Sequence, residues 1–223
     1  MEERFANRME AGRRLAERLS AYRDRDDAIV LGLPRGGVPV AYQVARQLGL
    51  PLDVFVVRKL GVPGYEELAM GAIASGNVVV LNEDVMRALP NSEAILETVI
   101  TQEKIELGRR ETRYRQDRPA PDLRGRVVLL VDDGLATGAT MRAAAAALRK
   151  KGVAKIVVAV PVGAPETCQG LELEVDEVIC AFTPAFFHGV GQFYEDFSQT
   201  SDEEVRELLI RANDEWRRRK SDQ

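Results

Sequence analysis

The sequence predicts an α/β protein in which helices flank a mainly parallel, five-stranded sheet. Apolar runs of strand length alternate with amphipathic segments of helix length, which is the pattern of successive βαβ units. Some of these runs are apolar at every position, as expected of strands buried on both faces. With 223 residues, 45% of them hydrophobic, the chain is long enough for one well-buried domain. We expect a single domain over 1–223, with its core at about 25–182.

The first quarter of the chain predicts one helix followed by one βαβ unit. Over 4–22, apolar side chains recur at helical spacing among Arg and Glu, which predicts an amphipathic helix that lies on the domain. Residues 28–33 are apolar, 37–48 have helical periodicity, and 52–57 follow a Gly-Leu-Pro breaker. These three segments predict a strand, a helix and a strand.

A long charged helix is expected over 91–116, with Ile95, Val99 and Ile105 facing inward. The alternation then resumes. The further elements that we expect are a strand at 126–132, a helix ending at about 151, and strands at 154–161 and 176–182.

The pattern changes after residue 182. Residues 183–200 are irregular and rich in aromatic side chains, and they predict a small hood over the sheet edge. Ser201 and Glu204 have the spacing of a capping box, which predicts a terminal helix over 201–217.

Composition excludes several classes of function. Lys and Arg number 31 against 35 Asp and Glu, so nothing in the net charge of −4 favours a nucleic acid or membrane partner. The N-terminus is charged and no apolar run approaches about twenty residues, which predicts a cytoplasmic protein. Cys168 and Cys180 are expected to be reduced packing residues. The single His188 excludes metal sites that need two imidazoles.

Two adjacent carboxylates follow the most apolar strand of the chain. Five apolar residues precede Asp132 and Asp133, and an Ala-rich helix is expected from Met141 to Lys150. The alternative is that one Asp only caps a turn or a helix. Together with the loop that follows, however, neighbouring carboxylates are suited to accept hydrogen bonds from the hydroxyls of a sugar.

That loop, residues 134–140, has the composition of a phosphate site. Gly134 and Gly138 allow close approach of the backbone, Thr137 and Thr140 supply hydroxyls, and amides at a helix start attract an anion. The loop lacks the lysine of nucleotide-triphosphate P-loops and the G-x-G-x-x-G spacing of dinucleotide sites.

Residues 127–140, Val-Val-Leu-Leu-Val-Asp-Asp-Gly-Leu-Ala-Thr-Gly-Ala-Thr, resemble the phosphoribosyl diphosphate (PRPP) signature of type I phosphoribosyltransferases. The resemblance implies that family's fold, with PRPP as substrate and Mg²⁺ as cofactor. It implies that Asp132 and Asp133 hold the ribose hydroxyls, with Asp133 also counted among the catalytic residues. The residues that would wrap the 5-phosphate are Ala136, Thr137, Gly138, Ala139 and Thr140, and Gly134 is also assigned to PRPP binding. Mg²⁺ would be held largely by PRPP near the two acids, with no protein ligand assigned.

A second anion cradle is expected after the first strand. Arg35, Gly36 and Gly37 combine a cation with glycines at a helix start, although a plain turn is an alternative. The segment resembles the pyrophosphate loop of the same enzymes. The resemblance implies that Arg35, Gly36 and Gly37 bind PRPP and that Arg35 is also catalytic. It further implies a cis peptide bond between Pro34 and Arg35.

Residues 57–64 have a composition suited to a mobile loop, with two cations before Gly, Pro and Gly. They resemble the family's flexible loop, which implies that Arg58 and Lys59 are catalytic and neutralise the diphosphate. The alternative is two solvated charges at a strand end.

The acceptor is less well defined by the sequence. The hood loosely resembles that of hypoxanthine-type members, which implies that Phe187 stacks on the acceptor and that His188 contacts it; packing roles are the alternative for both. Ala136 stands where some purine-specific members carry an acidic residue. We expect transfer to a nitrogen acceptor, a nucleobase with purine slightly favoured, by a homodimer. The alternatives are a regulator that senses PRPP without turnover, and a non-nucleobase acceptor.

Overall fold

The computed structural model describes residues 4–116 and 118–221, with the backbone alone at Glu66 and Glu67. Its main sheet has five parallel strands in the order β2-β1-β6-β7-β8. The strands are β1 (Ala28–Gly32), β2 (Leu52–Val54), β6 (Val127–Val131), β7 (Lys155–Val162) and β8 (Glu177–Phe182). The predicted fold class, with five mainly parallel strands between helices, is confirmed.

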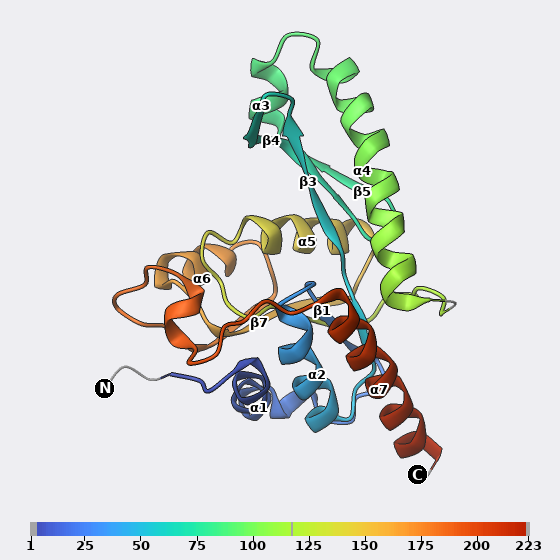
Figure 1. Cartoon of the computed structure of the whole chain (residues 1–223), viewed down its shortest axis with the longest axis vertical. Helices are drawn as coiled ribbons and strands as arrows, with labels where there is room; N and C mark the ends of the chain where they lie inside the picture. The colour runs from blue at the N-terminus through green and yellow to red at the C-terminus, as the bar shows by residue number, and fades with distance from the viewer. Residues whose placement is uncertain (1–3, 117, 222–223) are drawn as a thin grey trace.

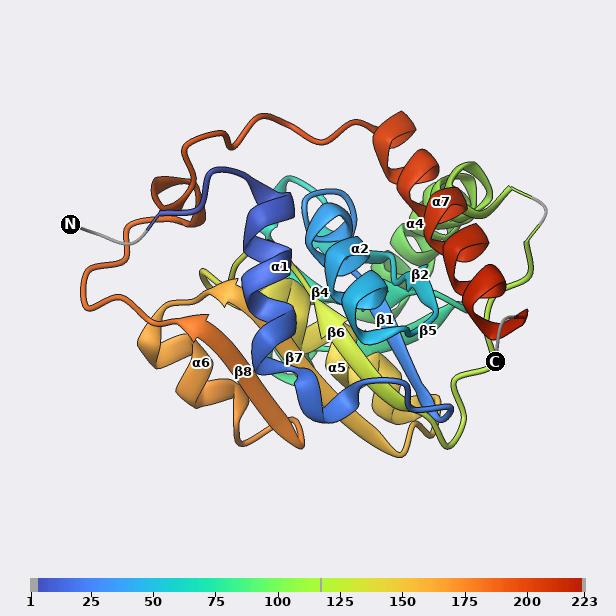
Figure 2. The same cartoon turned by 90° about the horizontal axis from the view of Figure 1, so that it is seen from below.

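Helices cover both faces of this sheet (Figures 1 and 2). On one face lie α1 (Arg8–Arg18) and α2 (Gly37–Leu48), with α7 (Asp202–Ser221) packed on α2. The other face is covered by α5 (Ala139–Lys150) and α6 (Pro165–Leu171).

The strand β6 shows how its sequence produces these two layers. Successive side chains of a strand point to opposite faces. Leu129 and Val131 belong to the cluster that includes α1 and α2, whereas Val128 and Leu130 belong to the cluster with α5 and α6. An all-apolar strand is therefore required, because both faces are buried.

A second unit, which we call the arm, rises from the sheet (Figure 1). It consists of β3 (Val57–Val62), β4 (Tyr65–Ala74), β5 (Val78–Leu81), α3 (Glu83–Ala88) and α4 (Ser92–Arg115). The three strands form an antiparallel sheet in the order β3-β4-β5. The sequence did not reveal this sheet.

Two predictions about this region are wrong. The strand expected over 52–57 ends at Val54, and Val57 begins the first strand of the arm. In α4 the prediction of Ile105 as an inward residue is also wrong, since its side chain is 71% exposed. The prediction for Val99 is confirmed, and it is buried together with Leu96 and Leu107, which lie along the same helical face.

The N-terminal helix is shorter than predicted. Asn7 caps α1 by accepting a hydrogen bond from the amide of Glu10 at 3.0 Å, so the residues before it are not helical. Phe5 instead pairs with Tyr194 of the hood, which contains a short 3-10 helix, η2 (Val190–Phe193).

The expectation that both cysteines are reduced is wrong in this structure. Cys168 on α6 and Cys180 on β8 form a disulfide. The sequence concealed the pairing because α6 folds back against the strand that follows it, and only the tertiary packing brings the two sulfurs together. Among the described helices, none is both long and apolar enough to cross a lipid bilayer.

Candidate functional site

The loops after β1 and β6 meet at the carboxyl edge of the sheet, where ligands bind in open α/β folds. The amide of Leu33 donates to the carbonyl of Val131 at 2.9 Å, which joins the two strand ends. The peptide bond between Pro34 and Arg35 is cis, as predicted.

Two glycines bring the loop after β1 against the acids that follow β6. A Cβ atom added at Gly36 would overlap the Asp133 carboxylate, with the carboxylate carbon at 2.9 Å. At Gly37 it would lie 2.9 Å from Oδ1 of Asp132. The backbone therefore reaches the acidic pair, Asp132 and Asp133, only because these positions lack side chains.

The acidic pair is held by one internal hydrogen bond and by bonds from two other parts of the chain. Asp132 Oδ1 accepts a hydrogen bond from the amide of Asp133 at 2.8 Å, and Asp133 Oδ2 accepts from Nε of Arg8 at 2.8 Å. The hydroxyl of Tyr194, in the hood, donates to the carbonyl of Asp133 at 2.6 Å. The pair is thus a fixed structure rather than two solvated side chains.

Burial raises the pKa of Asp132 well above its usual value, and the neighbouring Asp133 carboxylate raises it further. The pKa of Asp133 is also raised by burial, against the opposing effect of the Arg8 guanidinium. Hydroxyl donors or a cation at this edge would therefore be favourable partners, because they stabilise the charged form of the pair.

The phosphate loop, residues 134–140, is fixed at its base and open at its rim. Leu135 pairs with the end of β7 through its amide, which donates to the carbonyl of Val162 at 2.9 Å. Thr167 donates its hydroxyl to the carbonyl of Ala136 at 2.6 Å. Gly138 has a φ of 75°, which favours glycine, and it precedes the first residue of α5.

The rim of that loop presents the groups predicted from the sequence. The exposed residues are Ala136, Thr137, Ala139 and Thr140. The first amides of α5 have no carbonyl one helical turn earlier to bind, so they remain available to an anion. Gly134 is covered by the hood, since a Cβ there would lie 2.7 Å from Cγ2 of Val190.

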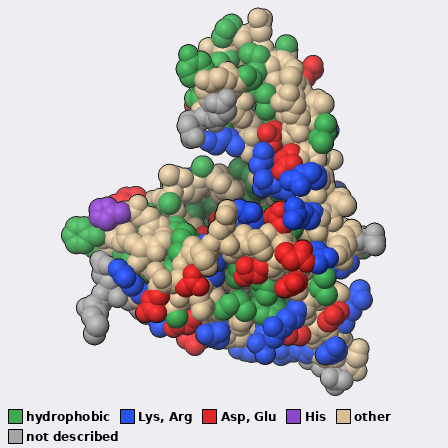
Figure 3. All heavy atoms as spheres, viewed as in Figure 1, with side chains coloured by type: hydrophobic (Ala, Val, Ile, Leu, Met, Phe, Trp, Pro, Cys, Tyr) green, Lys and Arg blue, Asp and Glu red, His purple; other side chains and the backbone are tan. Residues whose placement is uncertain are grey.

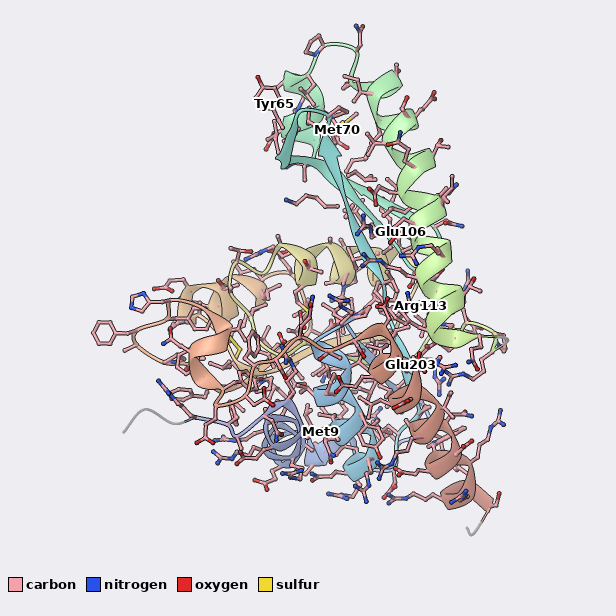
Figure 4. The ribbon with its side chains drawn as sticks, in the orientation of Figure 1. Met9, Tyr65, Met70, Glu106, Arg113 and Glu203 are labelled. Carbon is pink, nitrogen blue, oxygen red and sulfur yellow. A yellow bond between two sulfur atoms is a disulfide. The ribbon has the colours of Figure 1, made fainter. Side chains whose placement is uncertain are left out.

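Arg35 lies beside a carboxylate from the C-terminal helix. Asp202 Oδ1 is 3.9 Å from Nη1 of Arg35, and Asp202 Oδ2 is 3.0 Å from Nη1 of Arg113. The hydroxyl of Tyr114 donates to Asp202 at 2.7 Å. Figure 4 shows Arg113 on α4 beside the first turn of α7, where Glu203 is labelled. Two arginines therefore converge on one carboxylate next to the loop after β1.

The structure separates Arg58 from Lys59. Residues 57–62, predicted to belong to a loop, form the strand β3, and the proposed mobility of 57–64 stays a prediction. Neighbouring side chains of a strand point to opposite faces. Nε of Arg58 donates to Glu103 of α4 at 2.7 Å. Lys59 instead lines a cleft on the other face of the arm.

This cleft, of about 390 Å³, lies between the arm and α5. Figure 3 shows the hollow between the arm and the body of the molecule. Small side chains, including Ala72 from β4 and Ala143 from α5, leave the space open, and Ala139 and Thr140 of the phosphate loop line its end. The cleft therefore places Lys59 on the same side as the phosphate loop.

The hood positions Phe187 and His188 differently. Phe187 is partly buried and stacks on Phe193, with ring centroids 5.6 Å apart. The side chain of His188 is exposed, and its amide donates to Gln192 at 3.0 Å. The hydrogen bond from the hood to the backbone of the acidic pair comes instead from Tyr194.

Sequence patterns missed Arg8, Arg113, Tyr194 and Asp202. Asp202 lies in the first turn of α7, where an acidic residue is common because it complements the helix dipole and signals no ligand. Arg8 lies in the first turn of α1, where the dipole gives no reason for a cation. Arg8 reaches the site through its contact with Asp133, which lies 125 residues later in the chain, and no local pattern encodes such a contact.

Comparison with known proteins agrees with this geometry. The family model described as "Phosphoribosyl transferase domain" matches residues 3–196. Two Mycobacterium tuberculosis proteins, named "Putative phosphoribosyl transferase" in strains CDC 1551 / Oshkosh and ATCC 25618 / H37Rv, are each 49% identical over 209 residues. That match covers 94% of this chain and 47% of each relative, so the chain spans about half their length.

Among solved structures, the crystal structure of TT1426 from Thermus thermophilus is similar throughout. It has 43% identity and a TM-score of 0.83, covering 93% of this chain and 98% of that one. With two glycine cradles and an acidic pair at one sheet edge, and with the family model spanning most of its length, the chain belongs to the phosphoribosyl transferase domain family.

Proposed function

We propose that this protein transfers the 5-phosphoribosyl group of PRPP to a ring nitrogen of a nucleobase-like acceptor and releases diphosphate. The main support is the contact between the loop after β1 and the acidic pair, through Gly36 against Asp133 and Gly37 against Asp132. This contact places the loop suited to a diphosphate beside the acids suited to two vicinal hydroxyls. The loop suited to a 5-phosphate follows those acids directly in the chain, at the same edge of the sheet.

Each group has a role in this proposal. Asp132 and Asp133 accept the ribose hydroxyls, and the amides and hydroxyls of 137–140 bind the 5-phosphate. Arg35 and Lys59 neutralise charge on the departing diphosphate while C1 becomes oxocarbenium-like. Catalysis then depends on positioning and charge, and it requires no covalent protein nucleophile.

Magnesium fits this donor set as a substrate-bound ion. No cluster of three or more potential metal ligands is present among the described residues. Mg²⁺ typically uses one or two carboxylates together with substrate phosphates, and the adjacent oxygens of Asp132 and Asp133 would meet that need. When bound, it would supply positive charge to the diphosphate.

A PRPP sensor is the second candidate function. The observation that favours it is the pairing of Arg58 with Glu103, which directs one of the three expected diphosphate cations away from the cleft. A sensor would bind PRPP through the same acids and phosphate loop without transferring it. Transfer to a non-nucleobase acceptor is the third candidate, because Ala136 cannot act as an acid or a base on a purine.

The test is a diphosphate-release assay with PRPP, Mg²⁺ and a panel of adenine, hypoxanthine, guanine, xanthine, uracil and orotate. We propose that a purine gives turnover, and that Phe187 and His188 contribute to its binding. PRPP binding without release across the panel would favour the sensor or another acceptor. Light scattering of the same sample tests the proposed homodimer, for which a monomer mass is the contrary result.

Calorimetry with Asp133→Ala tests the assignment of the ribose site. We expect PRPP affinity to fall by roughly a hundredfold or more, since charge-assisted hydrogen bonds are lost. Asp122→Ala serves as the control, because this exposed carboxylate lies before β6 and accepts a hydrogen bond from the amide of nearby Arg124. Equal PRPP affinity in Asp133→Ala and wild type would overturn the assignment.

A further inference from the structure

Arg8 is the one residue of α1 that bonds to the acidic pair in the described part of the chain, and it also contacts the hood. Its Nε donates to Asp133 Oδ2 at 2.8 Å, and its Nη1 donates to the carbonyl of Ser198 at 2.6 Å. The guanidinium carbon lies 4.0 Å from the centroid of the Phe197 ring. A single side chain therefore joins two hood residues to the expected ribose site.

The chain before Arg8 is also fixed to the hood. The amide of Phe5 donates to the carbonyl of Phe193 at 2.8 Å, and the amide of Glu195 donates to the carbonyl of Phe5 at 2.8 Å. The carbonyl of Ala6 accepts from the amide of Asp196 at 3.0 Å. The N-terminal segment and the hood thus form a paired unit, and Arg8 follows it closely.

The side chain of Arg8 is well suited to hold a carboxylate in one orientation. It is only 11% exposed, so its ion pair is less screened by solvent than a surface pair. A guanidinium is planar and can stack on an aromatic ring while donating along its edge. Its Nε also lies beside Gly36, 3.2 Å from the position of an added Cβ. Arg8, Gly36 and Asp133 therefore lie together where the two anion cradles join.

We propose that Arg8 is a positioning residue for PRPP: it orients the Asp133 carboxylate and makes that orientation depend on the hood residues Phe197 and Ser198. This inference rests on the proposed function, because it takes Asp133 as a ribose ligand. Arg8 acts through Asp133 and does not itself touch the reacting atoms.

The experiment measures PRPP binding by calorimetry and steady-state kinetics with Mg²⁺ for Arg8→Ala, Arg8→Lys and the wild type. Arg8→Ala lowers PRPP affinity roughly tenfold to hundredfold, in line with the loss of a charged hydrogen bond, and raises KM for PRPP more than it lowers kcat. Arg8→Lys recovers part of the affinity, because it restores the charge without the planar fork. Arg13→Ala, an exposed position on the same helix, is the matched control and binds PRPP like the wild type.

A double-mutant cycle tests the link to the hood. Phe197→Leu alone weakens PRPP binding in the same direction as Arg8→Ala, and the effects of the two substitutions are not additive, since both act through one guanidinium. Thermal unfolding of each variant separates a folding defect from a binding defect.

Each outcome decides a different question. Wild-type protein that does not bind PRPP contradicts the proposed function. Wild-type binding with equal or tighter affinity in Arg8→Ala overturns the positioning role alone, and additive effects with Phe197→Leu overturn its dependence on the hood.

Discussion

The Asp202 carboxylate at the start of α7 lies 3.9 Å from the guanidinium of Arg35, which follows the cis peptide bond. The same carboxylate accepts a hydrogen bond from the hydroxyl of Tyr114 and pairs with Arg113 near the end of α4. Through this one side chain, the C-terminal helix connects the expected diphosphate loop with the base of the arm.

Replacement of Asp202 by Ala removes the acceptor of the buried Tyr114 hydroxyl. We expect the free energy of unfolding to fall by about 1–3 kcal/mol, the cost of an unsatisfied buried donor. Denaturant titration measures this. Glu203→Ala is the control, because Glu203 pairs with Arg206 on the helix surface and its loss should change stability by less than about 0.5 kcal/mol. Equal effects of the two substitutions would contradict the central place of Asp202.

Stability should also depend on Tyr114 at alkaline pH. Burial, followed by the hydrogen bond to Asp202, raises the pKa of Tyr114 to about 12 from its ordinary value of 10.0. The unfolded state therefore loses this proton first, and the contribution of Tyr114 to stability is complete below pH 10 and declines between pH 10 and 12. The maximum loss is roughly 2 kcal/mol for this pKa difference, once partial screening by solvent is allowed for.

The measurement compares unfolding of the wild type and Tyr114→Phe at about pH 9 and about pH 11.5, on either side of the onset of this decline. Other buried tyrosines also have a raised pKa, Tyr194 among them, so the difference between the two proteins is the informative quantity. A smaller decline in Tyr114→Phe is expected. An identical decline in both proteins would exclude Tyr114 as a source.

Gly36→Ala tests whether the two cradles must touch. The added Cβ overlaps the Asp133 carboxylate, so the loop or the acid has to move, and we expect PRPP affinity to fall at least about tenfold. Gly108→Ala is a useful contrast, because Gly108 lies inside α4 and nothing lies within 4 Å of a Cβ added there. The free energy of unfolding of this variant should rise by up to about 1 kcal/mol. Wild-type PRPP affinity in Gly36→Ala would argue against a shared ligand.

The two cations of β3 should behave differently when replaced. Lys59 faces the cleft beside the phosphate loop, so Lys59→Ala should lower kcat roughly tenfold or more by removing leaving-group charge. Arg58 lies on the other face of β3 and pairs with Glu103 of α4. Arg58→Ala should therefore lower the free energy of unfolding by about 0.5–1 kcal/mol and reduce kcat less than Lys59→Ala does. Steady-state kinetics and denaturation distinguish them, and a larger kcat loss in Arg58→Ala would reverse the assignment.

Much of the sheet could be predicted because its signals are local. The run before Asp132 is apolar at every position, and the helix expected at 37–48 has those bounds as α2. The arm could not be predicted in the same way. Its strands include Gly61 and Gly71, which weaken strand patterns, and their pairing is irregular near Gly61. The cleft-facing row of small side chains also has little apolar periodicity to detect.

By itself, the sequence determined where the apolar segments of the parallel strands lie, where the two glycine-containing loops lie, and that two acids are adjacent. Each of these features is a contiguous pattern of residues that can be recognised without the fold. The tertiary structure alone decided that Arg8 reaches Asp133, that Asp202 reaches Arg35, that Cys168 pairs with Cys180, and that Arg58 and Lys59 diverge. These relationships depend on how helices and strands pack across long chain separations. A local pattern specifies which face of an element is apolar, but not which distant charged side chain will meet it.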